Sequence, residues 1–163
     1  MLSVFPYRGM TGAFTLNAMT YDIQMAVDCK DAHAQADWWA ETLGWEVEPT
    51  DQDFITSMIE QGFATDADTI VHNNVRVWKD GAAICRPDQA ESKARQRILF
   101  QPVPESKSVK NRIHWDVRLA GEDKDEVRAR LEARGATFLY SETQGPHGWH
   151  TMADPEGNEF CIS

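Results

Sequence analysis

Apolar and polar residues alternate from residue 111 to residue 119, which predicts a strand with two chemically different faces. One face carries four apolar side chains, Ile113, Trp115, Val117 and Leu119. The opposite face carries three polar side chains, His114, Asp116 and Arg118. A helix over about 123–134, a strand over 137–140 and a turn at 154–158 before a last strand follow. This order is typical of a compact βαβ-type module.

A less regular copy of the same pattern lies near the start of the chain. Residues 21–28 alternate in the same way, and Asp31 is placed to cap a helix that runs through Leu43. Gly44 ends that helix before a short strand over 45–47. One stripe of the helix is apolar, and we expect it to pack on the apolar face of the preceding strand.

The two copies place Gln24 and His114 at matching positions, each at nearly the same distance before the glycine that ends the following helix. Two copies of one unit are expected to pair and to bury a shared face. Between them the sequence predicts a weak helix over 52–61 and strands over 75–78, 82–85 and 98–101. Asp80-Gly81 predicts a hairpin turn between the first two of these strands. His72 lies in a stretch without readable spacing, and we assign it no role.

If helices cover the apolar strand faces, the opposite faces must line the remaining space as a polar floor. The two opening strands contribute Gln24, Ala26, Asp28, His114, Asp116 and Arg118. Later strands contribute Phe100, Gln101, Glu159 and Cys161, the last two on one face by two-residue alternation. A concave polar cleft of this kind is the default ligand site.

The composition excludes several classes of protein. Acidic residues outnumber basic ones by 26 to 16, which argues against nucleic acid or an anionic membrane as partner because both bind clustered Lys and Arg. The three cysteines have no CxxC spacing, which favours reduced thiols in a cytoplasmic protein over a disulfide framework. The sequence contains no run of about 18 apolar residues, so it predicts no helix that spans a membrane.

The length of 163 residues suits a single domain over residues 21–163. Residues 1–20 are predicted to be an N-terminal extension with poor order. They lack the basic start and continuous apolar stretch of a signal peptide.

The duplicated module, His114 on the opening strand of its second copy and the closing turn at 154–158 resemble the vicinal oxygen chelate superfamily. That superfamily includes glyoxalase I, bleomycin-resistance proteins and extradiol dioxygenases. The sequence is most similar to its glyoxalase-like branch, through residues 100–107 and 110–116, and the resemblance covers roughly residues 21–162. It implies an α+β fold of paired βαβββ modules, about 21–104 and 111–163, that form a curved mixed sheet around a cleft with helices outside. It also implies a small-molecule ligand and a homodimer.

Metal-using members of the superfamily bind one divalent ion with a ligand from each of four strands. Carried over to this chain, the ligand positions are Gln24, Gln101, His114 and Cys161. Such a set would take Zn, Ni, Fe or Mn. Cys161 stands where a carboxylate is expected, which weakens the match, and Glu159 two residues earlier would act as a substitute ligand or as the catalytic general base.

Structural alternatives stand beside these roles. Glu159 could instead pair with Arg118 or Arg112, and Cys161 could be a small core residue. His147 and His150 follow a Gly-Pro turn, so a loop over the cleft mouth is one interpretation and a solvated loop is the other. Besides Asp116 and Arg118, we predict Trp149, by stacking, and His150 to contact the ligand.

Three functions stay open, of which the third is an interaction protein that uses an exposed apolar patch for assembly and has no ligand cleft. In the first, the protein is an enzyme of lyase, isomerase or dioxygenase type that acts on a small oxygenated organic substrate in the polar cleft. In the second, it is a metal-free protein that sequesters a ligand, as bleomycin-resistance proteins do. The replacement of the expected carboxylate by Cys161 favours the second.

Overall fold

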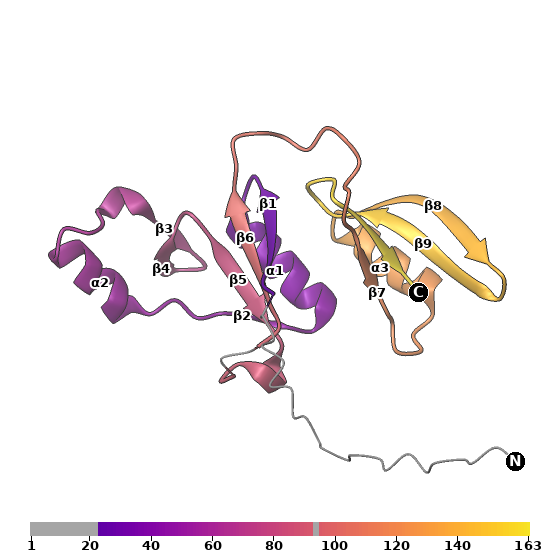
Figure 1. Cartoon of the computed structure of the whole chain (residues 1–163), viewed down its shortest axis with the longest axis horizontal. Coiled ribbons are helices and arrows are strands. Elements are labelled where there is room, and N and C mark those ends of the chain that lie inside the picture. The colour runs from indigo at the N-terminus through magenta and orange to yellow at the C-terminus, as the bar shows by residue number, and fades with distance from the viewer. Residues whose placement is uncertain (1–22, 93–94) are drawn as a thin grey trace, which may run out of the picture.

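Each copy of the duplicated pattern forms its own four-stranded sheet (Figure 1). The computed structural model describes residues 23–92 and 95–163, so the predicted extension over 1–20 lies outside the described residues. The first sheet has the order β1-β6-β5-β2, from β1 (Met25–Cys29), β2 (Glu46–Val47), β5 (Ala82–Cys85) and β6 (Arg97–Pro102). The second has the order β7-β10-β9-β8, from β7 (Trp115–Val117), β8 (Thr137–Gln144), β9 (His147–Ala153) and β10 (Glu159–Ile162). In each module the first strand pairs in parallel with the last.

The α+β architecture of paired βαβββ modules is therefore confirmed, and the crossover between the modules arches from β6 to β7 (Figure 1). Gln24 and His114 each stand one residue before the opening strand of their module, as the duplication predicted. None of the helices in the described part of the chain is both long and apolar enough to cross a bilayer.

The two main helices begin where their caps predict. In α1 (Ala32–Leu43) the Asp31 carboxylate accepts hydrogen bonds from the backbone N–H groups of His33 and Ala34. Gly44 follows in the left-handed conformation with φ 64°. In α3 (Lys124–Ala133) the Asp123 carboxylate caps the first turn in the same way.

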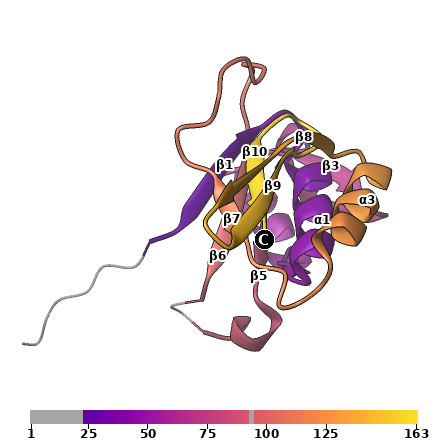
Figure 2. The same cartoon turned by 90° about the vertical axis from the view of Figure 1, so that its right-hand side faces the viewer.

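The two helices lie side by side against the sheets (Figure 2). The Trp38 indole Nε1 on α1 donates a hydrogen bond of 2.9 Å to the carbonyl of Arg134 at the end of α3. Trp39 is 2% exposed and packs edge-on against Trp115 and Phe160 of the second sheet, with ring centroids 4.4 and 4.9 Å apart. The same helix also packs on β5 and β6, so one hydrophobic core joins both modules.

The predicted helix over 52–61 and the predicted strand over 75–78 are both present in the segment between β2 and β5, but that segment also contains elements that were not predicted. It contains α2 (Gln52–Glu60), the short 3-10 helix η1 (Asp66–Asp68), β3 (Thr69–His72) and β4 (Val75–Trp78), and a second 3-10 helix, η2 (Pro87–Gln89), follows β5. The predicted hairpin at Asp80-Gly81 is wrong, because β4 pairs with β3 instead of β5. Asn73 and Asn74 form the turn with φ 47° and 63°, and two positive φ values suit the twist of a tight hairpin.

Two expectations for the second module are also corrected. The strand predicted over 111–119 is only three residues long, and Ile113 is 82% exposed instead of buried, because residues before His114 belong to the crossover. The loop expected at His147 and His150 is strand β9, which forms a hairpin with β8 around the Gly-Pro turn. Phe100, expected on the polar floor, is fully buried in the core beneath α1.

Candidate functional site

Three potential metal ligands converge at the start of the second module. Ligand atoms of His114, Asp116 and Cys161 all lie within 4.8 Å of one another. The parallel register of β7 and β10 sets Cys161 directly beside Asp116, and His114 precedes Asp116 by one strand repeat. The His114 and Asp116 side chains are 45% and 69% exposed, so the cluster is open to a ligand from solvent.

Cys161 forms the floor of this cluster. The residue is 8% exposed, and its Sγ lies 3.6 Å from the hydroxyl of Thr151 on β9. Burial raises the pKa of the Cys161 thiol, and the negative charge of Asp116 raises it further. In the absence of a cation the sulfur is therefore held as a thiol, and a bound cation would be needed to favour the thiolate.

Within the described part of the chain, neither the Gln24 nor the Gln101 side chain makes a hydrogen bond to His114, Asp116 or Cys161. The Gln24 amide oxygen accepts a hydrogen bond of 2.7 Å from Arg97 Nη1. Gln101 lies beside Asp28 in the parallel pair of β1 and β6. The structure brings together two of the predicted ligands, His114 and Cys161, and adds Asp116, which was predicted as a ligand-binding residue; Gln24 and Gln101 stay predictions.

Glu159, predicted as catalytic, contacts the crossover between the modules. Its carboxylate accepts a hydrogen bond of 2.9 Å from the backbone N–H of Asn111 and pairs with Lys107 Nζ at 3.0 Å. Glu159 therefore pairs with Lys107 and Asn111, and not with Arg118 or Arg112 as the structural alternative predicted. Burial alone would raise the pKa of Glu159, but the hydrogen bonds from Asn111 and Lys107 outweigh it and lower the pKa to about 2.

The other predicted ligand contacts are dispersed. His150 is 5% exposed, and its ring nitrogens contact the Ser141 hydroxyl at 2.8 Å and the Asp125 carboxylate at 2.9 Å. Trp149, its neighbour on β9, is half-buried, and Arg118 is exposed just after β7. The contacts of His150 suit a role in fixing the β8–β9 hairpin to α3, and a ligand contact by Trp149 or Arg118 stays a prediction.

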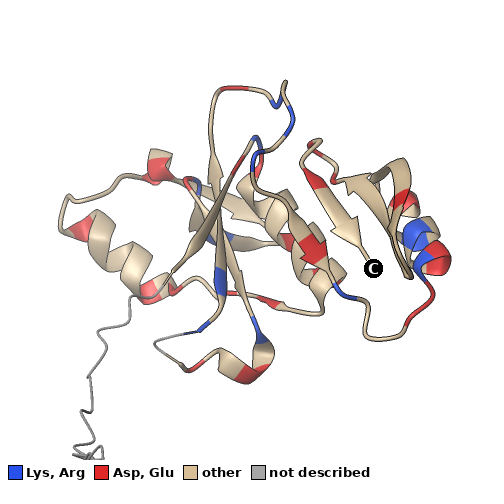
Figure 3. Ribbon diagram, turned by 45° about the vertical axis from the view of Figure 1, so that its right-hand side comes forward, with Lys and Arg blue, Asp and Glu red and all other residues tan. Residues whose placement is uncertain are grey.

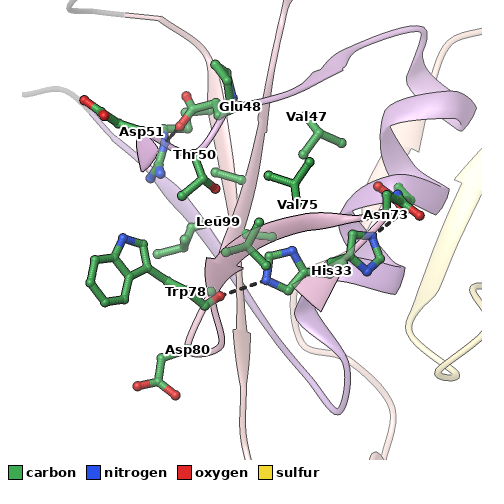
Figure 4. A pocket seen from close by; sticks show the side chains of 18 of the residues that line it. His33, Val47, Glu48, Thr50, Asp51, Asn73, Val75, Trp78, Asp80 and Leu99 are labelled. Carbon is green, nitrogen blue, oxygen red and sulfur yellow. Dashed lines mark hydrogen bonds and ion pairs between the residues drawn. The ribbon is translucent and has the colours of Figure 1, made fainter. Parts of the chain in front are cut away.

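A second feature was missed by the sequence reasoning. A cavity of about 650 Å³ lies in the first module, between the edge of β5, the β3–β4 ribbon and the segment that leaves β2 (Figure 4). His33, His72, Trp78 and Arg97 are among its lining residues. A turn-forming Asn-Asn pair between two alternating segments was the sequence signal for this ribbon.

The charged residues are distributed over both modules (Figure 3). Acidic side chains occur on the helices and on the loops, in keeping with the net charge of −10. The crossover carries lysines, one of which is the Lys107 held by Glu159.

Comparisons with known proteins agree with this architecture. A glyoxalase family protein from Bacillus cereus matches with a TM-score of 0.53 and 13% identity, over 92% of this chain and 97% of that one. The fosfomycin resistance protein FosX from Listeria monocytogenes matches with a TM-score of 0.53 and 10% identity, over 88% of this chain and 92% of that one. A member of the glyoxalase/bleomycin resistance protein/dioxygenase superfamily from Sphaerobacter thermophilus matches with a TM-score of 0.50 and 18% identity, over 88% and 96%.

At these identities the likeness shows a common fold alone. A search of curated proteins finds no significant match. The family model described as glyoxalase-like domain matches residues 24–163, which is most of the chain. The chain therefore belongs to the glyoxalase-like domain family, within the vicinal oxygen chelate superfamily.

Proposed function

We propose that this protein binds a small oxygenated organic molecule at the His114, Asp116 and Cys161 cluster, through a divalent metal ion held by these three side chains. The observation that carries the proposal is the convergence of their ligand atoms within 4.8 Å. An imidazole, a carboxylate and a thiolate are a donor set that suits zinc and related ions. Three protein ligands also leave a coordination position for a substrate oxygen, as in catalytic zinc sites.

The donor set therefore fits the metal that the family resemblance implies. When bound, such an ion would supply a Lewis acid that polarises a substrate carbonyl or stabilises an enediolate. The Thr151 hydroxyl on β9 contacts the Cys161 sulfur on the side away from β7, and this contact restrains the orientation of the Cys161 side chain. Chemistry of lyase, isomerase or dioxygenase type is the enzymatic form of this proposal.

Glu159 supports the site from outside. By holding Asn111 and Lys107 it anchors the crossover just before His114. A carboxylate with a pKa of about 2 is a weak base at neutral pH, because an efficient general base has a pKa near the working pH. These contacts favour an anchoring role over the proton transfer predicted for Glu159.

The test is metal content by mass spectrometry, on untagged protein purified without chelator and then incubated with Zn²⁺, Ni²⁺, Fe²⁺ or Mn²⁺ and desalted. We expect about one ion per chain in the wild type, a large loss in His114→Ala, and no loss in the matched control His147→Ala. His147 is exposed on β9, outside the ligand cluster. Equal metal content in the two variants, or none in the wild type, would contradict a metal site at His114.

A second candidate function is metal-free ligand sequestration. The hydrogen bond that Arg97 donates to the Gln24 amide oxygen favours it, because one oxygen of the four-strand ligand set is then already engaged. Ligand binding that persists in excess chelator would distinguish this function from the first. The homodimer also stays a prediction, which light scattering coupled to gel filtration would check.

A further inference from the structure

We propose that the cavity between β5 and the β3–β4 ribbon is a second ligand site, which binds a small organic cation that carries N–H donors (Figure 4). This site is independent of the proposed metal site. His114, Asp116 and Cys161 contribute nothing to its lining, which comes entirely from the first module.

The cavity exists because β2 is short. Two residues of β2 pair with Ile84 and Cys85 of β5, after which the chain departs toward α2. One further hydrogen bond, of 2.8 Å from the Glu48 N–H to the Ala83 carbonyl, continues this pairing before the chain leaves β5, and Ala82 and Ala83 line the cavity. The volume of about 650 Å³ is within the range of roughly 300 to 1,000 Å³ for small-molecule sites.

The lining combines an apolar wall with one aromatic ring. Val75, Val77 and Leu99 provide aliphatic surface, and Trp78 closes one side (Figure 4). Such a wall accommodates the hydrocarbon or aromatic body of a ligand. An indole is also the side chain that best attracts an organic cation through its ring face.

Two neighbouring histidines, His33 and His72, are among the residues that line the cavity. His33 Nε2 lies 2.8 Å from the backbone carbonyl of Trp78, and His72 Nε2 lies 2.7 Å from the Asp37 carboxylate. A carbonyl and a carboxylate can only accept, so the Nε2 atom of each ring carries the hydrogen. Neither Nδ1 atom is hydrogen-bonded within the described part of the chain. Their rings are neighbours, with centroids 5.0 Å apart.

The charge of the lining also favours a cation. Arg97, the one basic side chain among the described lining residues, is already held by Glu48 at 2.7 Å and by Gln24 at 2.7 Å. Asp80 has no hydrogen bond or ion pair with any described residue, and its carboxylate is exposed beside Trp78. A ligand that enters the cavity thus meets an unpaired negative charge at Asp80, while the guanidinium of Arg97 is already paired.

A metal ion does not fit this cavity as well as an organic cation does. The imidazoles and carboxylates of the described lining do not form a group of three with ligand atoms within 4.8 Å, whereas His114, Asp116 and Cys161 do. Acceptors spread over a large volume suit a primary amine or an amidine with an apolar body.

The experiment compares three probes of one shape in the presence of EDTA and physiological salt: benzylammonium, benzyl alcohol and benzoate. Binding is followed by amide chemical shifts of the ¹⁵N-labelled full chain, up to about 10 mM probe, where a Kd in the millimolar range is still measurable. We expect saturable binding of benzylammonium with shifts at residues 75–80, weaker binding of benzyl alcohol, and no binding of benzoate.

Asp80→Asn should weaken benzylammonium binding about fivefold, the effect of one partly exposed ion pair. Asp53→Asn, which removes an exposed charge on α2 outside the cavity, should leave the Kd unchanged. Benzoate or benzyl alcohol binding as tightly as benzylammonium, equal Kd values for the two variants, or no saturable binding of benzylammonium to the wild type would overturn the proposal. Because EDTA is present throughout, these outcomes do not depend on the metal site at His114.

Discussion

At the scale of single residues, the same type of side chain has opposite uses in the two halves of this protein. The Glu159 carboxylate binds the Asn111 N–H and the Lys107 ammonium and so anchors the crossover. The Asp80 carboxylate has no partner among the described residues and lies at the cavity. Cys161 and Asp116 touch each other because of strand register. Position in the hydrogen-bond network, more than residue type, separates anchoring groups from those available to a ligand.

The first prediction concerns Glu159→Gln. This change removes the charge that Asn111 and Lys107 stabilise, and it should lower the free energy of unfolding at pH 7 by roughly 1 to 2 kcal/mol. Because folding lowers the pKa of Glu159 from 4.5 to about 2, its stabilisation is fully present above about pH 4.5 and is lost as the pH falls toward 2.

Urea unfolding at pH 7 and at pH 3 measures this effect. The gap between wild type and Glu159→Gln should shrink at pH 3, while the control Glu142→Gln, exposed on β8, should match the wild type at both values. A gap that stays constant with pH would show that the lowered pKa of Glu159 does not contribute to stability.

At the scale of elements, the β3–β4 ribbon is the part of the fold that creates the cavity wall. It pairs with no strand of either four-stranded sheet, so its own turn must supply much of its order. Asn73 and Asn74 supply it by adopting positive φ, which asparagine tolerates better than most residues do.

The second prediction tests that turn. Asn74→Val should destabilise the ribbon by about 1 to 2 kcal/mol, because a β-branched residue is strained at φ 63°. Asn74→Gly should preserve or slightly stabilise it. Hydrogen exchange of the amides of residues 69–78 should become about 5- to 30-fold faster in Asn74→Val only. Equal acceleration in both variants would show that the turn conformation is not what orders the ribbon.

Prediction from sequence succeeded where the signal was local. Asp31 and Gly44 bound α1 because capping depends on the residues at the ends of the helix themselves. It failed for Asp80-Gly81 because a turn signal does not say which strands pair, and for Ile113 because the crossover interrupts the alternation. The cavity could not be predicted from the sequence, because its walls come from four segments that only the folded chain brings together.

At the scale of the whole molecule, a single core unites the two modules. Trp39 belongs to α1 in the first module, yet its ring packs against the rings of Trp115 and Phe160 in the second module. Its indole Nε1 also donates to the buried Asp154 carboxylate at 3.1 Å, next to the closing turn. The modules should therefore unfold as one unit despite their separate sheets.

The third prediction concerns Trp39→Ala. The cavity left at the junction should cost about 3 to 5 kcal/mol of stability. In the wild type, unfolding curves from far-UV circular dichroism and from tryptophan fluorescence should coincide. Trp78→Ala, at a half-buried site at the end of β4, is the control and should cost less. Two separate transitions in the wild type would show that the modules are independent.

The parallel pairing within each module has a consequence for synthesis on the ribosome. In both modules the strand made first pairs with the strand made last, β1 with β6 and β7 with β10, and β10 lies in the interior of its sheet. While β10 is still untranslated, β7 and β9 expose the backbone edges that will receive it. The emerging second module thus passes through a stage in which these unpaired edges can contact another chain or a chaperone, and only the arrival of β10 closes them.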